Sequence, residues 1–549
     1  MKTIRILLLL FLFAFPVLMI AHGEAETPLG WQLVGEGIEY QQFHLVSPVP
    51  VNVFVARMAR SNPNVTIESS IAQGRLSGGT ETVSNMALRY DNALNFWGEP
   101  TIPVTPTWGS TNDVIVAING FYFNNKTDPL GVPWSGQVHS SWYAKRFTDL
   151  EASSGFIWKM DRSTFIGGCI SHPADKQFVY NFANKTYTYF TDVNRTRADT
   201  ELILYTPQFD RDTNTDNSGT EVLVEMLAPT DISTFGNMPY GIVRRIRVNQ
   251  GSTPIPFDHV VLSGQGVKAQ ELSTNLHIGD IVGIAQKVVD CTPVNDWTNA
   301  YAGVGGHWRF LINGVIYPFL EDGQANVHDP RTAIAYNTDY IFFIVADGRD
   351  TNFSEGMTVK EMAEFAKYTL GATDGIMQDG GGSSTMVING EVVNNTFCNN
   401  VYCASKVYLP LVMNSSNTLT ATNQPAKPFE PEVEWDAEAQ ILQRLVANGM
   451  LMVVVQPMQK STEPYDQGDP VTTLGTINVY TGPGTNYAVL TSFMGNGTII
   501  QPLNDLGGVS AKDQYWWKVD FGAIEGWVPE ALIIPQLKLR STIHDLKTR

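Results

Sequence analysis

The stretch Gln378–Met386, with the sequence QDGGGSSTM, sets three consecutive glycines between one carboxylate, Asp379, and two hydroxyls, Ser383 and Ser384. Glycine loses more backbone freedom on folding than any other residue. A chain therefore keeps three in a row where the backbone must turn sharply or pass close to a ligand. We interpret this turn as a candidate reaction centre.

Around this turn the sequence predicts one clear helix and many short strands. The helix is expected over Thr358–Leu370, where Thr358 and Glu361 have the spacing of a capping box and an apolar stripe follows. Strand-like runs at Val114–Ile118, Glu221–Val224 and Tyr340–Val345 alternate with turns rich in Gly, Asn and Asp. These patterns favour an α+β fold with a central mixed sheet.

Length and charge limit the classes of protein to consider. A chain of 549 residues is too long for one hydrophobic core, so two or more domains are expected. The formal net charge of -18 argues against a nucleic-acid partner, because phosphate binding needs a basic surface.

The N-terminus has the pattern of an export signal over residues 1–23. Lys2 and Arg5 precede the apolar run Ile6–Ile20, which at 15 residues is shorter than the ~20 needed to span a bilayer. An uncleaved membrane anchor is the alternative reading. No second long apolar run follows, so we expect a protein that is secreted, extracellular or in the cell envelope and is not an integral membrane protein.

The four cysteines fit an oxidising compartment. Cys398 and Cys403 are close in sequence and are expected to bridge a local loop, which would leave Cys169 with Cys291. Three pairings are open, and sequence alone does not choose among them. No cysteine spacing resembles a zinc site.

Composition also divides the chain. A tract at 398–440 contains two cysteines and several prolines and has the composition of an insertion, and 456–473 has that of a polar linker. The expected segments are 1–23 (signal peptide), 27–112 (N-terminal part of the catalytic region), 113–455 (principal domain), 398–440 (its insertion), 456–473 (linker) and 474–535 (small C-terminal all-β barrel).

The C-terminal segment has strands at Ile477–Tyr480, Tyr515–Val519 and Gly526–Val528, and the turn Gly482–Gly484 follows the first of them. It resembles a bacterial Src-homology-3-like domain. The resemblance implies cell-wall peptide or glycan as a partner, with the aromatic residues either in the core or in a ligand groove.

Four clusters in the principal domain place polar residues at the ends of apolar strands: Ile118–Phe123, His328–Ala335, Ile344–Arg349 and the glycine turn that begins at Asp379. A buried strand can present side chains from its end to a pocket. Each cluster alone is weak, since an Asp-Gly pair after a strand is commonly a plain turn, whereas their joint order is specific.

That order resembles the phosphodiester glycosidase family over roughly residues 50–455. The matching stretches are Asn119–Gly120, Pro330–Ile334, Asp347–Arg349, Gly356–Thr358, Asp379–Ser384 and Arg444–Asn448. The chain departs from the family pattern where Phe121 replaces a second glycine, where Asp329 displaces His328 by one position, and where Ala335 replaces glycine.

The resemblance implies a hydrolase that cleaves the glycosidic bond of sugar 1-phosphodiesters, such as those of N-acetylglucosamine. A carboxylate suits the oxocarbenium-like transition state, and the planar fork of arginine suits the departing phosphate. The expected catalytic residues are Asp379, Asp347 and His328. The expected substrate-binding residues are Asn119, Gly120, Arg331, Thr332, Arg349, Gly380, Gly381, Gly382, Ser383, Ser384 and Arg444, with the backbone N–H groups of Gly380–Ser384 as an anion nest.

Two other classes remain open at this point. One is a metal-dependent phosphodiesterase, for which His328 and Asp329 give slight support and which would need a divalent cation. The other is a non-catalytic protein that binds cell wall or glycan through its C-terminal barrel. No organic cofactor is expected in any of the three readings.

Overall fold

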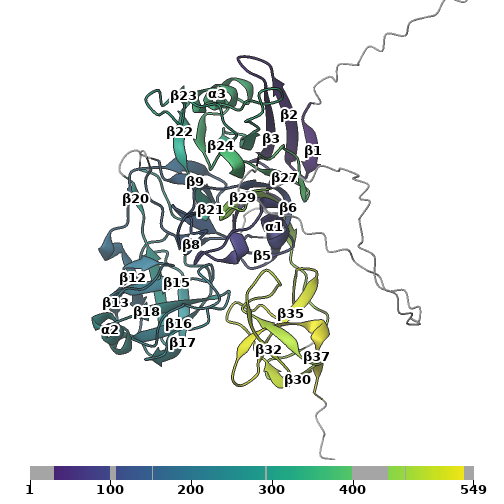
Figure 1. Ribbon diagram of the computed structural model, residues 1–549. Coiled ribbons are helices and arrows are strands. Elements are labelled where there is room, and N and C mark those ends of the chain that lie inside the picture. The colour runs from purple at the N-terminus through teal and green to yellow at the C-terminus, as the bar shows by residue number, and fades with distance from the viewer. Residues whose placement is uncertain are drawn as a thin grey trace, which may run out of the picture.

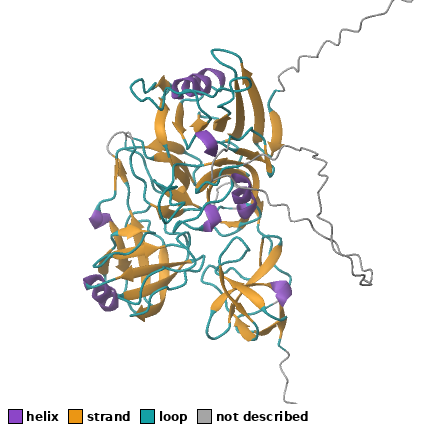
Figure 2. Cartoon of the chain, viewed as in Figure 1, coloured by secondary structure: helices purple, strands orange, loops and turns teal. Residues whose placement is uncertain are grey.

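The computed structural model describes residues 30–98, 107–150, 153–290, 294–397, 443–463 and 465–536. The signal peptide, most of the insertion 398–440 and three of the four cysteines lie outside these residues. In the described parts the chain is mostly β, with 37 strands and only three α-helices: α1 (Val83–Tyr90), α2 (Val267–Asn275) and α3 (Val359–Glu364). The predicted α+β fold was therefore wrong in its helix content, which is lower than expected (Figures 1 and 2).

The predicted helix is confirmed. The Thr358 hydroxyl accepts a hydrogen bond from the Glu361 N–H, and the Glu361 carboxylate accepts one from the Thr358 N–H, which completes the capping box. The helix continues into a wider π-helical turn at Phe365–Thr369. Gly371, at φ +69°, then allows the chain to reverse.

A first sheet of eight strands carries α3 on one face. Val359, Met362 and Phe365 from α3 and the π-helical turn pack against Val55 and Ile344 of the sheet. The strands, in spatial order, are β1 (Gln32–Gly35), β2 (Ile38–Leu45), β3 (Val51–Ala59), β25 (Tyr340–Ala346), β24 (Arg331–Tyr336), β26 (Asp374–Met377), β22 (His307–Ile312) and β23 (Val315–Ile316).

Two smaller sheets lie against the other face of the first. One consists of β28 (Glu391–Val392), β27 (Met386–Ile388), β6 (Ser110–Asn119), β29 (Asn448–Pro457) and β4 (Val65–Ile71), with β5 (Leu94–Asn95) beside β6. The other consists of β10 (Thr164–Gly167), β9 (Gly155–Lys159), β21 (Ala300–Gly305), β7 (Gln137–His139) and β8 (Trp142–Lys145). Ile118, Phe156, Val304, Phe343 and Met450 belong to the one buried core that the three sheets share.

Every strand pair in the described parts of these three sheets is antiparallel. The expected mixed sheet is found elsewhere in the predicted principal domain, where β14 (Asp192–Val193) pairs in parallel with β15 (Leu202–Tyr205). The predicted strands themselves are confirmed. Val114–Ile118 lies in β6, Tyr340–Val345 lies in β25, and the run after Arg444 becomes β29, which pairs with both β4 and β6.

Residues 177–286 form a separate lobe that the sequence did not distinguish from the principal domain; we call it the inserted domain (Figure 1). Its strands, in spatial order, are β13 (Thr186–Tyr189), β12 (Gln177–Asn181), β19 (Ile281–Gln286), β17 (Tyr240–Val248), β16 (Thr220–Met226), β18 (His259–Gly264), β15 (Leu202–Tyr205) and β14 (Asp192–Val193). The short ladder of β11 (Ile170–Ser171) with β20 (Val289–Asp290) joins the lobe to the rest of the chain.

The antiparallel register of that ladder sets Ile170 opposite Asp290, so the chain segments next to Cys169 and Cys291 run side by side. This agrees with the predicted pairing of the two cysteines. Cys291 lies outside the described residues, as do Cys398 and Cys403, so both disulfides stay predictions.

The C-terminal domain forms one further sheet. Its strands are β30 (Pro470–Thr473), β31 (Ile477–Tyr480), β32 (Val489–Phe493), β33 (Asn496–Ile499), β34 (Val509–Ala511), β35 (Gln514–Asp520), β36 (Glu525–Pro529) and β37 (Ile533–Pro535). No described ladder joins the end strands β32 and β37, so closure into a complete barrel is not seen. The predicted linker 456–473 was wrong at both ends, because β29 runs to Pro457 and β30 already belongs to this domain.

The C-terminal domain packs against the other two domains through a shared core. Trp108 contacts Phe257 of the inserted domain, and Phe257 contacts Trp527 of the C-terminal domain, with ring centroids 5.3 and 5.5 Å apart. Lys512 donates hydrogen bonds to the backbone oxygens of Leu88 and Asp91. The domain is therefore docked on the rest of the molecule. In the described part of the chain, no helix is both long enough and apolar enough to cross a membrane.

Candidate functional site

A cavity of about 450 Å³ opens where the ends of β6, β25 and β26 meet the beginnings of β22, β24 and the segment before β29. Side chains of both signs of charge face it, together with aromatic rings and the glycine turn. Its lining residues are Tyr122, His307, Trp308, Asp322, Gln324, Asp329, Arg331, Arg349, Asp379, Gly380, Gly381, Gly382, Phe397 and Arg444. Half of them are predicted site residues, drawn from four separate motifs.

Asp379 stands two residues after β26, where the chain is fixed on both sides. Its N–H donates to the oxygen of Gly120, and its own backbone oxygen accepts a hydrogen bond of 2.7 Å from the Asn119 amide. The carboxylate accepts a hydrogen bond of 2.6 Å from the Ser383 hydroxyl. Burial raises the pKa of Asp379 to about 6, although the Ser383 hydrogen bond and the charge of Arg444 act in the opposite direction. A carboxyl with this pKa is well placed to exchange a proton near neutral pH.

The surroundings of the glycine turn explain why it has three consecutive glycines. A Cβ on Gly380 would lie 2.8 Å from the oxygen of Pro330, and one on Gly382 would lie 2.9 Å from the oxygen of Phe397. Gly381 has φ +62°, in the region that favours glycine. The turn thus brings the backbone against two neighbouring segments.

The predicted anion nest is smaller than expected. The N–H groups of Gly381, Ser383 and Ser384 donate within the fold, to the oxygens of Pro330, Gly380 and Gly381 respectively. They are therefore not available to an anion. The arginines that line the cavity remain the groups with the charge to hold one.

Arg331 begins β24 and is held rigidly. Its Nε donates to the oxygen of Met357, and its Nη2 donates to the oxygens of Gln324 and Val327. Within the described residues its Nη1 donates to no partner, and that nitrogen belongs to a side chain that lines the cavity. Burial lowers the pKa of Arg331, but a guanidinium stays charged at any ordinary pH. Its rigid backbone contacts make it a preorganised donor.

Arg349 forms a bidentate pair with Asp329, with Nε to Oδ1 at 2.7 Å and Nη2 to Oδ2 at 3.2 Å. Its φ of +66° is uncommon for a residue with a side chain. Its guanidinium lies over the ring of Phe397, 5.4 Å from the centroid. Strained backbone of this kind occurs preferentially at functional sites.

Arg444 reaches the same cavity from the segment before β29. Its guanidinium lies over the Phe123 ring, 5.9 Å from the centroid, and its charge lowers the pKa of Asp379. Arg444 is an expected substrate-binding residue that follows the insertion 398–440 in the sequence. The structure places it in the cavity wall. The bulk of the insertion lies outside the described residues.

Asn119 and Thr332 support the site from behind. The Asn119 oxygen accepts hydrogen bonds from the Thr332 hydroxyl at 2.8 Å and from the Thr385 N–H at 3.1 Å, while its amide holds Asp379. Both residues are fully buried and neither lines the cavity. Their part is to position the glycine turn, not to contact substrate as expected.

Gly120 is constrained by Asn448. Its N–H donates to the Asn448 backbone oxygen, and an added Cβ would lie 2.4 Å from the side-chain oxygen of Asn448. That oxygen also accepts from the N–H of Phe121. We expect Gly120→Ala to lower the free energy of unfolding by about 1–3 kcal/mol, as overpacked cores do, measured by chemical denaturation. The control is Gly236→Ala, where no atom lies within 4 Å of the added carbon. An equal effect at both positions would contradict this account.

Four of the other predicted residues are not part of the cavity wall: Asp347, Ser383, Ser384 and His328. Asp347 is buried and accepts hydrogen bonds from the Asn394 amide at 2.9 Å and from the Asn395 N–H at 3.0 Å. Burial raises its pKa to about 6, yet it faces the segment after β28. The structure does not support catalysis by Asp347. Ser383 and Ser384 are buried below the turn, Ser383 as a donor to Asp379.

His328 also points elsewhere. Its Nε2 lies 2.9 Å from the Glu361 carboxylate at the start of α3, and it does not line the cavity. Asp329, which the sequence analysis treated only as a departure from the family pattern, is the residue that faces the pocket. Successive residues of an extended chain point in opposite directions. Because His328 is displaced by one position from the family pattern, a carboxylate faces the cavity where the pattern has a histidine.

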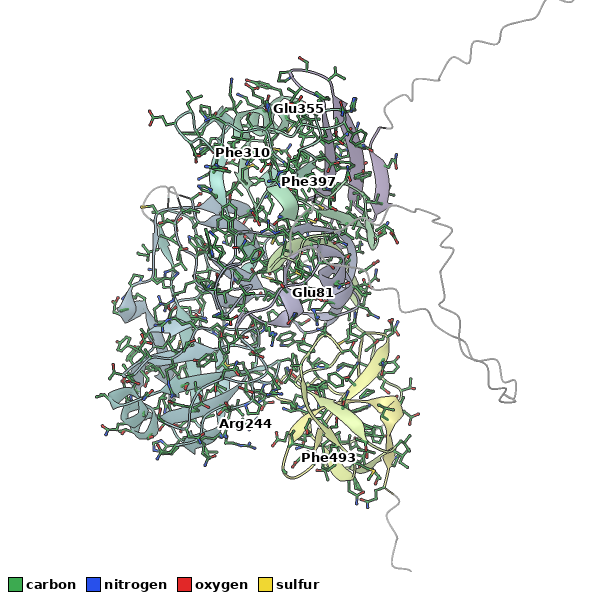
Figure 3. All side chains as sticks on the ribbon, in the orientation of Figure 1. Glu81, Arg244, Phe310, Glu355, Phe397 and Phe493 are labelled. Carbon is green, nitrogen blue, oxygen red and sulfur yellow. The ribbon has the colours of Figure 1, made fainter. Side chains whose placement is uncertain are left out.

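Sequence reasoning also missed an aromatic wall. His307 and Trp308 begin β22 and stack with ring centroids 4.3 Å apart, and the Trp308 indole donates to Asp322. Tyr122 and Phe397 complete the wall, and Phe397 is labelled in Figure 3. The signal was present in the sequence, since a histidine and a tryptophan follow directly after the buried strand β21 and two glycines. Such a wall suits the apolar face of a sugar ring.

The part of the chain that the structure describes holds no group of three or more His, Cys, Asp or Glu side chains arranged to hold a metal ion. His328 and Asp329, the pair that supported a metal-dependent reading, face different partners, Glu361 and Arg349. The metal-dependent reading therefore loses its main structural support.

Comparison with known proteins confirms both resemblances. Residues 245–409 match the family model of phosphodiester glycosidase, and residues 475–534 match that of the bacterial SH3 domain. The chain thus contains a region similar to phosphodiester glycosidases, followed by a region similar to bacterial SH3 domains. No curated protein matches the sequence significantly.

Three solved structures are similar in outline. A hypothetical protein from Synechocystis is 16% identical with a TM-score of 0.45, covering 76% of this chain, and this chain spans 62% of its length. A protein from Burkholderia pseudomallei described as exported is 15% identical with a TM-score of 0.43. The match covers 73% of this chain and 74% of the Burkholderia protein. The third is the catalytic domain of zebrafish N-acetylglucosamine-1-phosphodiester alpha-N-acetylglucosaminidase, auto-inhibited by its pro-peptide. It is 12% identical with a TM-score of 0.29, and the match covers 67% of this chain and 80% of the zebrafish domain. Similarities of this size say nothing about the site.

Proposed function

We propose that this protein is an exported hydrolase that cleaves the glycosidic bond of a sugar 1-phosphodiester in the cavity beside Asp379. The observation that carries the proposal is the convergence of one half-buried carboxyl and three arginines, Arg331, Arg349 and Arg444, on one 450 Å³ cavity with an aromatic wall. Water adds across the bond between the anomeric carbon and the phosphate oxygen. The products are a free sugar and a phosphomonoester.

Each group has a distinct part in this reaction. The arginines hold the phosphate and stabilise the negative charge that it gains as the bond breaks. Ionised Asp379 stabilises the positive charge that develops on the sugar, or removes a proton from the attacking water. Because phosphate is a good leaving group, the reaction has little need of a strong general acid, which fits the position of His328 outside the cavity.

The experiment that tests the proposal is turnover of a panel of sugar 1-phosphodiesters by the purified protein in ¹⁸O-labelled water. We expect the label in the sugar, because attack is at the anomeric carbon, and turnover that survives a chelator. Label in the phosphate would instead indicate a phosphodiesterase that cleaves the P–O bond, and sensitivity to chelator would add a metal. No turnover of any member would contradict the proposal.

The pH dependence follows from Asp379. Its pKa is raised to about 6, chiefly by burial, so the carboxylate form is lost as the pH falls through 6. We expect kcat/KM to rise with pH up to about 6 and then to level. In the Arg444→Ala variant this limb should move to higher pH, because Arg444 favours the ionised form. A limb near pH 4 in the wild-type enzyme would assign the reaction to a different carboxyl.

Arg444 gives a prediction of its own for substrate binding. We expect Arg444→Ala to lower kcat/KM about 10- to 100-fold, since hydrogen bonds to charged groups contribute roughly 1.5–3 kcal/mol. Arg444→Lys should recover only part of the loss, because an ammonium cannot copy the bidentate fork. The measurement is steady-state kinetics on a phosphodiester substrate. Wild-type kinetics for Arg444→Ala would remove this residue from the phosphate site.

Export and wall binding belong to the same proposal. The charged start and short apolar run of residues 1–23 support cleavage of a signal peptide, which N-terminal sequencing of the secreted protein would test. The bacterial SH3 match supports attachment to cell-wall material. Retention of the full chain on purified wall fragments, compared with a soluble control protein, tests the second point.

A further inference from the structure

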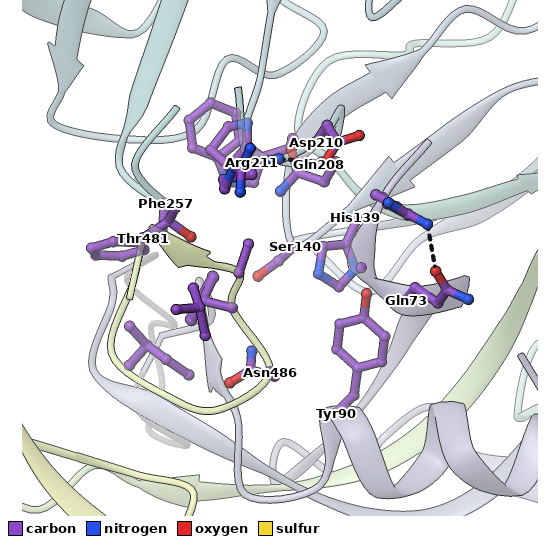
Figure 4. A pocket seen from close by; sticks show the side chains of 18 of the residues that line it. Gln73, Tyr90, His139, Ser140, Gln208, Asp210, Arg211, Phe257, Thr481 and Asn486 are labelled. Carbon is purple, nitrogen blue, oxygen red and sulfur yellow. Dashed lines mark hydrogen bonds between the residues drawn. The ribbon is translucent and has the colours of Figure 1, made fainter. Parts of the chain in front are cut away.

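A second cavity, of about 490 Å³, lies where three domains meet, and it shares no lining residue with the cavity beside Asp379. We call it the junction cavity. Figure 4 shows side chains from each domain around one open space: Tyr90 and His139 from the first part of the chain, Arg211 from the inserted domain, and Asn486 from the C-terminal domain. No single domain could form it alone.

The floor of the junction cavity is built on a buried carboxylate. Glu68 is fully buried, and its Oε1 accepts hydrogen bonds from the N–H groups of Ser69 and Ser140, both at 2.9 Å. His139 Nδ1 lies 3.3 Å from the same oxygen and 2.7 Å from the oxygen of Ser69. A buried polar group is costly unless it is hydrogen-bonded, and these bonds also fix its neighbours. Here it fixes Ser140 and His139 at the cavity surface.

The loop between β31 and β32 closes the cavity from the C-terminal domain. This loop contains the turn Gly482–Gly484 that stood out in the sequence. Thr481 accepts a hydrogen bond from the N–H of Phe257 at 2.9 Å, and a Cβ on Gly482 would lie 2.8 Å from the Phe257 Cβ. Gly482 is therefore what lets the loop come this close to the inserted domain.

The lining combines aromatic rings with amides. The rings of Tyr487 and His139 are partly exposed, and Gln73, Gln208 and Asn486 give groups that both donate and accept. The Asn486 side-chain oxygen is buried and, within the described residues, accepts no hydrogen bond. The side-chain amides of Gln73 and Gln208 belong to the same wall.

The charged groups in this cavity already pair with protein partners. Arg211 lies 3.3 Å from Asp212, and Arg75 donates to Gln73 at 2.8 Å. The wall of the junction cavity holds two arginines and three carboxyl groups, against three of each in the cavity beside Asp379, and this excess of acidic groups disfavours a phosphate ligand. Aromatic faces with amide donors and acceptors suit the apolar faces and the hydroxyls of a sugar. We propose that the junction cavity binds a short neutral glycan and that it is a second carbohydrate site, independent of the proposed hydrolytic one.

Titration calorimetry of the full chain with soluble oligosaccharides of two to four pyranose units, from chitin and from cellulose, tests this proposal. We expect binding with a Kd of about 1 mM or lower. Ala488→Trp should lower the affinity at least tenfold, because Ala488 is an exposed residue of the cavity wall and the indole would fill the space. Arg211→Ala, a milder change, should weaken binding less.

Two control variants separate the sites. Met494→Trp adds the same ring to the same domain at an exposed position outside the cavity and should bind as the wild type does. Arg444→Ala alters the cavity beside Asp379 and should also leave oligosaccharide binding unchanged. Circular dichroism and Tm check that each variant folds. The proposal is overturned if no oligosaccharide binds, if Ala488→Trp binds normally, or if Arg444→Ala abolishes binding, whether or not phosphodiesters are hydrolysed.

Discussion

Replacing Asp379 with asparagine is expected to lower kcat on a sugar 1-phosphodiester by roughly a hundred- to ten-thousand-fold, the usual range for a positioned acid–base group. The change keeps the shape of the side chain and an oxygen that can accept from Ser383, whose hydroxyl lies 2.6 Å from the carboxylate. The backbone contacts with Asn119 and Gly120 do not depend on the side chain. KM should change much less than kcat.

The same substitution should not weaken the fold. The pKa of Asp379 is higher in the folded protein than the ordinary value of 3.8, so the folded state binds a proton more tightly than the unfolded chain does. Stability from this group is greatest at low pH and falls as the pH rises from about 4 to about 6. At pH 7 the folded protein therefore carries an unfavourable buried charge, which asparagine removes. We expect the Tm of Asp379→Asn at pH 7 to equal or exceed that of the wild type.

Asp347→Asn is the matched control. Both carboxyls have a pKa raised to about 6 by burial, and both follow a strand of the first sheet, but only Asp379 lines the cavity. Steady-state assays should show activity within about tenfold of wild type for Asp347→Asn, with any effect on Tm arising from the Asn394 and Asn395 contacts. Equal losses of activity in the two variants would contradict the assignment of Asp379, as would Asp379→Asn with wild-type kcat.

For Asp347 and Asp379, the sequence predicted the position in the sheet but not the direction of the side chain. An aspartate after an apolar strand is correctly predicted to lie at a sheet edge. Sequence does not say toward which face its side chain points, because the strand end leaves the regular alternation. Asp347 turns to Asn394, and His328 turns to Glu361, through contacts made by segments that are distant in sequence.

The arginines were easier to predict because each is tied to a motif with a fixed place on a strand. Arg331 begins β24, and Arg444 lies just before β29, which closes the second sheet between β4 and β6. The aromatic wall was harder, since His307 and Trp308 resemble ordinary core residues in a strand. Nothing local distinguishes an aromatic ring that lines a pocket from one in a core.

At the level of the fold, strands could be predicted but not their distribution among sheets. The strands of the inserted domain alternate like their neighbours, and which strands pair is decided by contacts far apart in sequence. The register of β16 with β17 and β18 is an example. The sequence likewise suggested a free linker before the C-terminal domain, because polar composition does not show that β30 pairs with β33 and β37.

Removal of residues 460–549 is expected to destabilise the remainder of the chain strongly. Phe257 contacts Tyr487 and Trp527 of the C-terminal domain, and Trp108 contacts Phe257 in turn. Exposing a large buried apolar side chain costs about 1.5–3 kcal/mol, so exposing these two costs about 3–6 kcal/mol, a large part of a typical stability of about 5–15 kcal/mol.

Polar contacts add to that loss. Glu225 of the inserted domain is buried, lies 3.6 Å from the Lys518 ammonium, and accepts a hydrogen bond from the Leu503 N–H. Truncation removes both partners and leaves Arg244, 2.6 Å away, as the counter-charge. A buried carboxylate that loses its donors is destabilising.

Scanning calorimetry of the full and truncated proteins tests this expectation, with a decrease in Tm of about 10 °C or more or a collapse in soluble yield as the expected result. Lys512→Ala is the matched variant, since it removes only the contacts of one partly buried side chain with Leu88 and Asp91 and should change Tm by a few degrees at most. A truncated protein with an unchanged Tm would mean that the C-terminal domain is a tethered module. A large decrease would mean that the domain is a structural part of the molecule, as expected if its β31–β32 loop exists to complete the junction cavity.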